Sequence, residues 1–428
     1  LMRYLIYFLF SLLIVTFTGC NKNDEPHPEN IETSILLYAV ASNNLSYSFY
    51  QDLYELKDGL ENCDLSQTEV FVYSITQAKD DVPSLYKIVR DKDGVLTQEV
   101  IKTYDREVAS TSPQRISTVI DDYNNLTNAS KRGLILWSHA TAWAPAPKPR
   151  KSGKLANENS LVHYALPTDN SVDVSVDEVP GVNNFGSITP SGSYWWGQDN
   201  NSGVSSYCNI TDLASAIPDN LFDYIWFDCC YMSSVEVIYE LRNKADRFVA
   251  YPTEVLAEGA PYSIIIPYIA TTQPDLIGAA EAMSQYYLKA HKTFTIAVID
   301  PNLIDKVADM ASNVATLTPI SEHDLLIYSR GGYYFYDFGQ FISTKQSVAE
   351  YIDIEEFCNT MNRLILYKNC GNKLFTGEPI DLKNFSGISS GYIGNLSDLQ
   401  NTSDDALKYY QSLEWFKRVY LPYLSSNN

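Results

Sequence analysis

The sequence predicts an α/β fold with a mostly parallel central sheet, and three observations lead to that expectation. Short apolar runs alternate with segments of helical periodicity along most of the 428 residues. The runs are apolar at successive positions, as in 34–40 and 222–228, so both faces of each strand are expected to be buried. Most strands are separated by helices, which is the connection that parallel neighbours require. Helices are therefore expected on both sides of the sheet.

Local signals justify the individual elements in chain order. Residues 85–102 are expected as a hairpin that turns at Asp93-Gly94. Ser112 is the expected cap of a helix that starts with Pro113 and runs to about residue 126. Further strands are expected at 69–75, 133–139, 222–228, 247–251, 294–300 and 388–393, and further helices at 49–60, 211–217, 232–241, 274–290 and 303–317.

The composition excludes several classes of protein. Hydrophobic residues make up 45% of the chain and charged residues 19%, which is enough apolar surface for one large core or two medium ones. A wholly disordered chain, a collagen-like chain and a small disulfide scaffold are excluded. The net charge is −21, from 31 basic and 52 acidic side chains. Because an acidic surface repels phosphate backbones, no nucleic-acid partner is expected.

The N-terminus has the pattern of a secretory signal peptide over residues 1–19. A basic start is followed by an apolar run that is shorter than the about 20 residues needed to span a bilayer. The stretch Phe17-Thr18-Gly19-Cys20 resembles a bacterial lipobox, which implies that Cys20 is acylated. A polar, proline-containing tether follows over 20–32. We therefore expect a cell-envelope lipoprotein, anchored by its lipid in the outer membrane and exposed at the surface; the alternative is an ordinary signal peptide with a chance cysteine.

A single domain, residues 33–428, is expected after the tether. Its pattern is interrupted over 144–200, which is rich in Pro, Gly, Ser and Asn and is interpreted as a long insertion loop. From about residue 320, helices mix with short strands in a C-terminal extension.

The remaining cysteines predict no metal site. Their spacing matches no zinc pattern. An oxidising envelope permits disulfides, and Cys358 with Cys370 is a candidate local pair. The six cysteines other than Cys20 are Cys63, Cys208, Cys229, Cys230, Cys358 and Cys370.

Two reactive side chains follow buried strands directly. Ligands bind at the C-terminal ends of the strands in such sheets, and His139 and Cys230 lie at or just past two of these ends. A cysteine nucleophile needs a lowered thiol pKa, a base and donors for an oxyanion. Cys230 precedes the helix expected near Met232, whose N-terminus would favour the thiolate. The backbone N–H groups of Ala140 and Cys230 are the expected oxyanion donors. Each residue alone is more often a packing or capping residue, so the hypothesis depends on the pair.

These segments resemble the motifs of clostripain-related cysteine peptidases. Residues 134–143 read Leu-Ile-Leu-Trp-Ser-His-Ala-Thr-Ala-Trp and look like the histidine motif of that family. Residues 227–241 look like its cysteine motif, with Cys230 as the nucleophile and Cys229 in place of a small residue. Further landmarks match at Asn43-Asn44-Leu45, 248–254 and 335–338, so the resemblance covers about residues 33–420.

The resemblance implies a three-layer caspase-like sandwich and a cysteine endopeptidase. His139 and Cys230 would form a dyad that hydrolyses peptide bonds through an acyl-enzyme. Cleavage after Arg or Lys is implied, because acidic side chains line the first specificity pocket of the family. Asp228 matches one such acid, and Glu254 or Glu258 could supply a second. No cofactor is predicted, although calcium dependence would be compatible with the family.

Two positions depart from the family pattern just after the histidine. Ala140 and Ala142 stand where the family has glycine. If the backbone there needs a positive φ, alanine costs about 1 kcal/mol or more and displaces an oxyanion donor. The alternative function is therefore a catalytically inactive surface lipoprotein of the same fold that binds peptide.

The insertion loop contains a basic cluster that a peptidase of this kind could cut. Relatives in the family are often activated by self-cleavage between the histidine and the cysteine. Arg150, Lys151 and Lys154 are the candidate positions, and the alternative is a solvated loop.

Three consecutive aromatic residues suggest one more alternative. Tyr194, Trp195 and Trp196 could stack on a sugar, as in a glycan-binding protein. The same rings could pack beneath the long loop, and packing is the preferred interpretation.

Overall fold

The computed structural model describes the domain that follows the expected tether. Cys20, Arg150, Lys151, Lys154 and Tyr194 lie outside the described residues, so their expected roles remain predictions. Within the described part, no helix is long and apolar enough to cross a membrane. The described residues are 31–143, 195–201, 205–314, 317, 325–329, 335–345, 347–375, 377–391 and 404–422.

Among these residues, the centre of the fold is a nine-stranded sheet. The middle strands β2, β1, β5, β8 and β9 run parallel, whereas β3 and β4 at one edge and β10 and β13 at the other run antiparallel to their neighbours. The expected α/β fold with a mostly parallel sheet is therefore confirmed. In spatial order the strands are β13 (Ile365–Cys370), β10 (Thr295–Ile299), β9 (Ala245–Ala250), β8 (Phe222–Asp228), β5 (Lys131–Trp137), β1 (Thr33–Ala41), β2 (Thr68–Thr76), β3 (Ser84–Arg90) and β4 (Leu96–Thr103).

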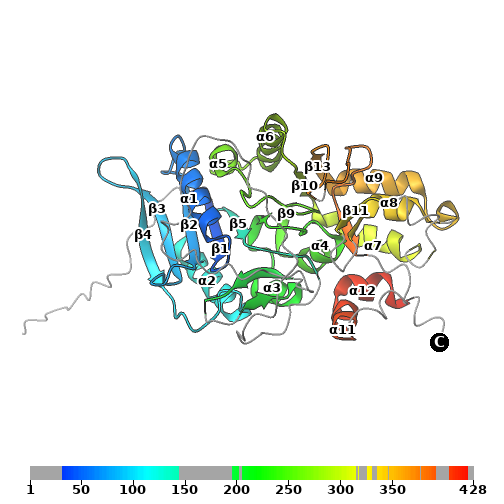
Figure 1. Ribbon diagram of the computed structural model, residues 1–428, viewed down its shortest axis with the longest axis horizontal. Coiled ribbons are helices and arrows are strands. Elements are labelled where there is room, and N and C mark those ends of the chain that lie inside the picture. Colours follow the sequence, from blue (N-terminus) through cyan, green and yellow to red (C-terminus); the bar gives the residue numbers. More distant parts are fainter. Residues whose placement is uncertain are drawn as a thin grey trace, which may run out of the picture.

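Both faces of the sheet are buried, as the continuous apolar runs predicted. Every residue of β1 is buried. Leu37 and Tyr38, which are consecutive in this strand, belong to hydrophobic clusters on opposite faces of the sheet. Helices α1, α5 and α6 cover the face of Leu37, and α2, α3, α4 and α7 cover the face of Tyr38, which gives three layers (Figure 1). The helices are α1 (Ser46–Leu60), α2 (Pro113–Leu126), α3 (Ile210–Ala216), α4 (Val235–Leu241), α5 (Tyr262–Ile269), α6 (Leu276–Lys289) and α7 (Ile304–Ser312).

Side-chain caps decide where several helices begin. Ser112 caps α2 as predicted, because its Oγ accepts a hydrogen bond from the Arg115 N–H at 3.2 Å. Helix α4 begins later than expected, at Val235, because the Oγ of Ser234 accepts from the N–H of its third residue. Helix α5 was not expected, since Pro267 within it is typical of a helix break.

The C-terminal part packs into the same body and does not stand apart. Strand β13 completes the main sheet beside β10, and β11, β12 and β14 form a small antiparallel sheet. Strand β14 reaches the start of α4, where Ser389 bridges to Ser234. The other strands are β6 (Trp196–Asp199) and β7 (Ser206–Cys208), which pair with each other, and β11 (Ile327–Ser329), β12 (Phe335–Asp337) and β14 (Ser389–Gly391). The other helices are α8 (Phe338–Ser343), α9 (Ile354–Leu364), α11 (Asp404–Ser412) and α12 (Glu414–Val419), with short 3-10 turns η2 (Pro301–Leu303) and η4 (Val348–Glu350).

The candidate disulfide between Cys358 and Cys370 is not formed. Cys358 lies on an exposed face of α9, whereas Cys370 is buried at the end of β13, and both thiols are free. Proximity in sequence is not enough for a disulfide, because the two side chains point into different environments.

Candidate active site

His139 and Cys230 follow the ends of two neighbouring strands at the same number of residues. Strands β5 and β8 are parallel neighbours, and Trp137 pairs with Asp228 at their C-terminal ends. His139 and Cys230 each follow two residues later, so each lies just past one of two adjacent strand ends. We call residues 138–143 the histidine loop and residues 229–234 the cysteine loop.

His139 is held by a polar side chain from a third strand end. Its Nε2 atom lies 2.7 Å from Oδ1 of Asn44, which follows β1. The ring is half-buried and meets Trp195 edge-on at 6.3 Å between centroids. Burial lowers the pKa of His139 to about 4, so the imidazole is neutral at neutral pH. With an amide oxygen at Nε2, the proton belongs on Nε2 and the lone pair on Nδ1.

Cys230 is a protonated thiol in this arrangement. Its Sγ accepts a hydrogen bond from the Val255 N–H at 3.2 Å, which favours the thiolate. Burial outweighs that contact and raises the pKa of Cys230 to about 12, with smaller contributions from the negative charges of Glu254 and Asp228. The expected help from a helix N-terminus is absent, because α4 begins five residues after the thiol. The thiol therefore needs a base to become nucleophilic.

Each of the two loops contains a residue other than glycine with a positive φ. Ala142 has a φ of 68° and Tyr231 a φ of 64°, a region that side chains other than glycine rarely adopt. Of the two alanines that replace family glycines, only Ala142 takes the left-handed conformation, whereas Ala140 does not. The cost of the replacement therefore falls on Ala142 and not on the expected oxyanion donor.

The N–H of Ala140 points away from Trp196, its partner in an isolated bridge. Ala140 forms an antiparallel bridge with Trp196, in which the His139 carbonyl accepts from Gly197 N–H at 2.8 Å and Thr141 N–H donates to the Trp195 carbonyl at 2.7 Å. In such a pair the N–H of the middle residue points away from the partner strand. The partner strand lies on the β1 side, since the Asn43 side chain donates to the Gln198 carbonyl, so the Ala140 N–H faces the β8 side.

The three acidic side chains expected to bind substrate lie in different environments. Asp228 is buried, and its carboxylate accepts from the Ala260 N–H at 3.0 Å and from the Tyr262 hydroxyl at 2.9 Å. Burial raises the pKa of Asp228 to about 6. Glu258 is 44% exposed and forms an ion pair with Lys292.

Glu254 is the acidic side chain whose charge acts most strongly on the Cys230 thiol. It is half-buried, and burial raises its pKa, although a hydrogen bond with Tyr231 opposes that shift. Glu254 therefore lies at the cysteine loop with a carboxylate that is not paired with a lysine or arginine among the described residues.

Comparison with known proteins identifies the family. The model of the clostripain family matches residues 37–158 and 189–420. The chain belongs to the clostripain family of cysteine peptidases. No curated protein matches it.

Solved structures share the fold of this clostripain-family chain. A secreted cysteine protease from Bacteroides thetaiotaomicron in complex with an irreversible peptide inhibitor is 24% identical, with a TM-score of 0.69 over 92% of this chain and 99% of that chain. An inactive zymogen protease from Parabacteroides distasonis is 25% identical, with a TM-score of 0.69 over the same shares. These likenesses confirm the expected caspase-like sandwich.

The roles of two residues at the candidate site, Asn44 and Val255, were not predicted from the sequence. Asn44 was noted only as part of a family landmark, and Val255 was not noted. A signal for Asn44 existed, because this polar residue closely follows β1, the strand next to β5. Val255 acts through its backbone, so its side chain gave no signal.

The aromatic residues beside the histidine loop are buried and do not form an exposed platform for a sugar. Trp195 packs on Tyr207 with ring centroids 4.2 Å apart, and Trp196 packs near Tyr38 at 5.8 Å. Both indoles are almost inaccessible. The structure therefore supports packing for Trp195 and Trp196.

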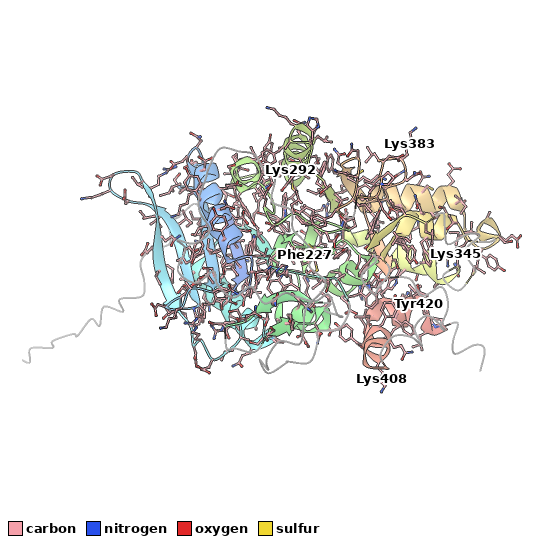
Figure 2. All side chains as sticks on the ribbon, viewed as in Figure 1. Phe227, Lys292, Lys345, Lys383, Lys408 and Tyr420 are labelled. Atoms are coloured by element: carbon pink, nitrogen blue, oxygen red, sulfur yellow. The ribbon has the colours of Figure 1, made fainter. Side chains whose placement is uncertain are left out.

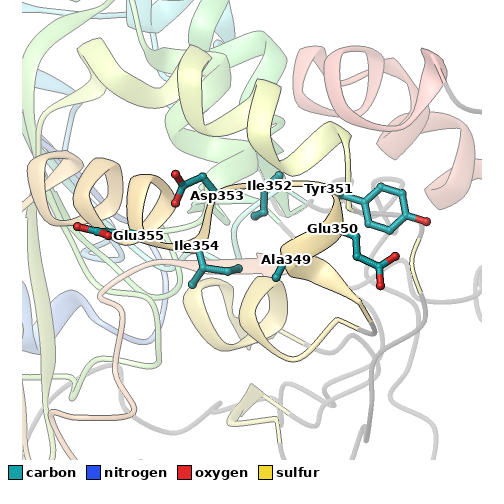
Figure 3. Close-up of a pocket in the computed structure, with 7 residues that line it drawn as sticks. All are labelled: Ala349, Glu350, Tyr351, Ile352, Asp353, Ile354 and Glu355. Atoms are coloured by element: carbon teal, nitrogen blue, oxygen red, sulfur yellow. The ribbon is translucent and has the colours of Figure 1, made fainter.

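Other features of the described surface lie outside the site. An open hollow of about 590 Å³ is lined by residues 349–355, none of which belongs to the histidine or cysteine loop (Figure 3). Within the described ranges, no group of three His, Cys, Asp or Glu side chains is arranged to hold a metal ion.

Proposed function

We propose that this chain is a cysteine endopeptidase that cleaves after Arg or Lys with His139 and Cys230 as its dyad. The observation that supports the proposal is the pairing of Trp137 with Asp228, because His139 and Cys230 each follow a member of this pair by two residues at adjacent strand ends. Family membership supports peptide or protein as the substrate class.

The protonation states favour general-base activation of the thiol. Nδ1 of His139 would take the thiol proton as Sγ of Cys230 attacks the carbonyl carbon. The backbone N–H groups of Ala140 and Cys230 would stabilise the oxyanion of the tetrahedral intermediate. His139 would then give the proton to the leaving amine, and a water activated by the same imidazole would hydrolyse the thioester.

Glu254 is the best-supported residue for recognising a basic side chain. The oxygens of Asp228 are already engaged by Ala260 and Tyr262, and Glu258 is paired with Lys292. The carboxylate of Glu254 lies at the cysteine loop, where the residue preceding the cleaved bond would bind.

A matched pair of cysteine variants tests catalysis. Purified protein should cleave a fluorogenic peptide that ends in Arg or Lys, and Cys230→Ala should abolish this cleavage. Cys229→Ala, which removes the adjacent buried thiol, should retain it. If the wild type cleaves no peptide in reducing buffer, with or without calcium, the result would instead favour an inactive peptide-binding protein of the same fold.

A matched pair of glutamate variants tests specificity. Glu254→Gln should raise KM for the Arg peptide by roughly tenfold or more, because it removes a charge-assisted hydrogen bond worth about 1.5–3 kcal/mol. Glu258→Gln should leave KM close to that of the wild type. A larger effect at Glu258 would assign the specificity acid to that residue.

Two further parts of the proposal concern the processing of the chain. Acylation of Cys20 would anchor the protein in the cell envelope, and a Cys20→Ser variant should lose incorporation of labelled palmitate. Self-cleavage at Arg150, Lys151 or Lys154 would activate it, and mass spectrometry of an active preparation should detect the new termini. An active enzyme with an intact loop would remove the activation step.

A further inference from the structure

The C-terminal part of the chain contacts both loops of the candidate site. We infer that Phe335 and Tyr410 are positioning residues, which hold the histidine loop and the cysteine loop in the relative placement that the dyad needs. The inference rests on the proposed function, because it concerns the geometry of His139 and Cys230.

The ring of Phe335, in β12, lies between an aromatic side chain of each loop. Its centroid is 5.9 Å from Trp143 of the histidine loop and 5.3 Å from Tyr231 of the cysteine loop, and the latter pair is stacked. Phe335 is itself buried. Tyr231 is the residue with positive φ directly after Cys230, so this stack supports a strained backbone next to the thiol.

The side chain of Tyr410, in α11, makes a second connection. Its ring lies 4.3 Å from that of Trp143, between centroids. Its hydroxyl donates to Oε1 of Glu236 at 3.2 Å, and Glu236 lies in the first turn of α4, directly after the cysteine loop. One side chain therefore contacts the histidine loop through its ring and the helix that follows the cysteine loop through its hydroxyl.

Strand β14 contacts the same two side chains, Glu236 and Trp143. The N–H of Gly391 donates to Oε1 of Glu236 at 2.8 Å, and a Cβ at Gly391 would lie 2.2 Å from the ring of Trp143. The N–H of Ser389 donates to the carbonyl of Ser233 in the cysteine loop at 2.9 Å. The fit leaves no room for a side chain at position 391, so the contact depends on glycine there.

These contacts matter because the sheet itself does not fix the loops. The pairing of β5 with β8 ends at Trp137 and Asp228, two residues before His139 and Cys230. A displacement of about 1 Å can lower a rate by roughly a hundredfold. Helix α12 and strand β14 both contact α4, and in Figure 1 the red α12 lies near the green α4. In Figure 2 the labels Tyr420 and Lys408 mark this C-terminal region below Phe227 of β8.

The test compares Phe335→Leu and Tyr410→Phe with a matched control, Tyr328→Phe. Tyr328 is also a buried tyrosine of the C-terminal part that donates to a carboxylate, but its partner is Asp337 and its ring packs near Phe385. Two readouts are measured in the full chain. The first is kcat and KM on an Arg peptide, and the second is the rate at which iodoacetamide alkylates Cys230 at about pH 8.

Both positioning variants should lower kcat about tenfold or more with little change in KM. They should also speed alkylation about tenfold, since loosening of the loop hydrates the thiol and lowers its pKa. Tyr328→Phe should change both quantities less than twofold at a similar loss of thermal stability.

Wild-type kcat and alkylation rates in both positioning variants, or equal changes in the control, would overturn the inference. If the wild type cleaves no peptide, the proposed function fails, but the alkylation rates still decide whether the C-terminal part positions the cysteine loop.

Discussion

Oδ1 of Asn44 lies 2.7 Å from Nε2 of His139, and this contact joins the ends of two neighbouring parallel strands. Asn44 lies in a turn that the side chain of the preceding residue stabilises. The side chain of Asn43 donates to the Val40 carbonyl and accepts from the Leu45 N–H, which fixes the turn between β1 and α1. The amide oxygen can therefore select one tautomer of the imidazole, with the lone pair on Nδ1.

Removal of this amide should impair the proposed catalysis and leave binding intact. Asn44→Ala is expected to lower kcat roughly tenfold to hundredfold, because the imidazole loses its orientation and its preferred tautomer, whereas KM should change little. Steady-state kinetics on an Arg peptide measure both. Asn44→Asp keeps the acceptor and should retain more activity than the alanine variant. A kcat for Asn44→Ala within twofold of the wild type would show that this contact has no role.

The sequence predicted the strands of the sheet more closely than the helices and loops that connect them. Residues 222–228 were expected as a strand and form β8, because an apolar run buried on both faces has few alternatives. The cap at Ser112 was also predicted, since its signal is local. Helix α4 was expected to begin near Met232, but Ser234 caps it and it begins at Val235.

Long-range features had no local signal. The antiparallel direction of β10 relative to β9 depends on where the chain crosses the sheet, which periodicity does not encode. The contact of Tyr410 with Glu236 joins residues 174 positions apart. The raised pKa of Cys230 results from burial and was likewise not accessible from the spacing of motifs.

The pH profile of the proposed enzyme should reflect a histidine with a lowered pKa. Burial lowers the pKa of His139 to about 4, so the base stays neutral down to that pH. The acid limb of kcat at saturating peptide is therefore expected near pH 4 and not near the value of about 6.5 of an exposed histidine. Measurement of kcat between about pH 3.5 and 8 locates the limb separately from any change in KM caused by protonation of Glu254, whose pKa is raised by burial. Asn44→Asp, which adds a negative charge beside the ring, should move it upward; a wild-type limb near 6.5 would contradict the burial argument.

The two alanines of the histidine loop should respond differently to glycine. Both are buried, so each substitution removes one buried methyl group. Only Ala142 has a positive φ, where glycine relieves about 1 kcal/mol of strain. Ala142→Gly should therefore be more stable than Ala140→Gly by about that amount in urea unfolding. Equal unfolding free energies would mean that the left-handed conformation at position 142 carries no strain.

The buried carboxyl group of Glu236 should make stability depend on pH with a defined sign. Burial raises its pKa to about 7, against about 4.3 in an unfolded chain. The folded state therefore holds a proton between these values that the unfolded state has lost. The free energy of unfolding should decrease as the pH rises through this window, by at most about 1.4 kcal/mol per pH unit, and the contribution is complete below pH of about 4.3.

Glu236→Gln isolates this contribution, because glutamine keeps an acceptor for the N–H of Gly391 and does not titrate. His139 acts in the opposite direction between about pH 4 and 6.5, but it is present in both proteins and cancels in their difference. Urea unfolding at about pH 5, 6, 7 and 8 should show the wild type losing stability relative to the variant up to about pH 7 and no further. Glu355→Gln, at an exposed position of α9, is the matched control. Parallel curves for the wild type and Glu236→Gln would mean that the carboxyl is already ionised when it packs against Tyr410, and the hydrogen bonds at Glu236 would then have to be assigned to a buried charge.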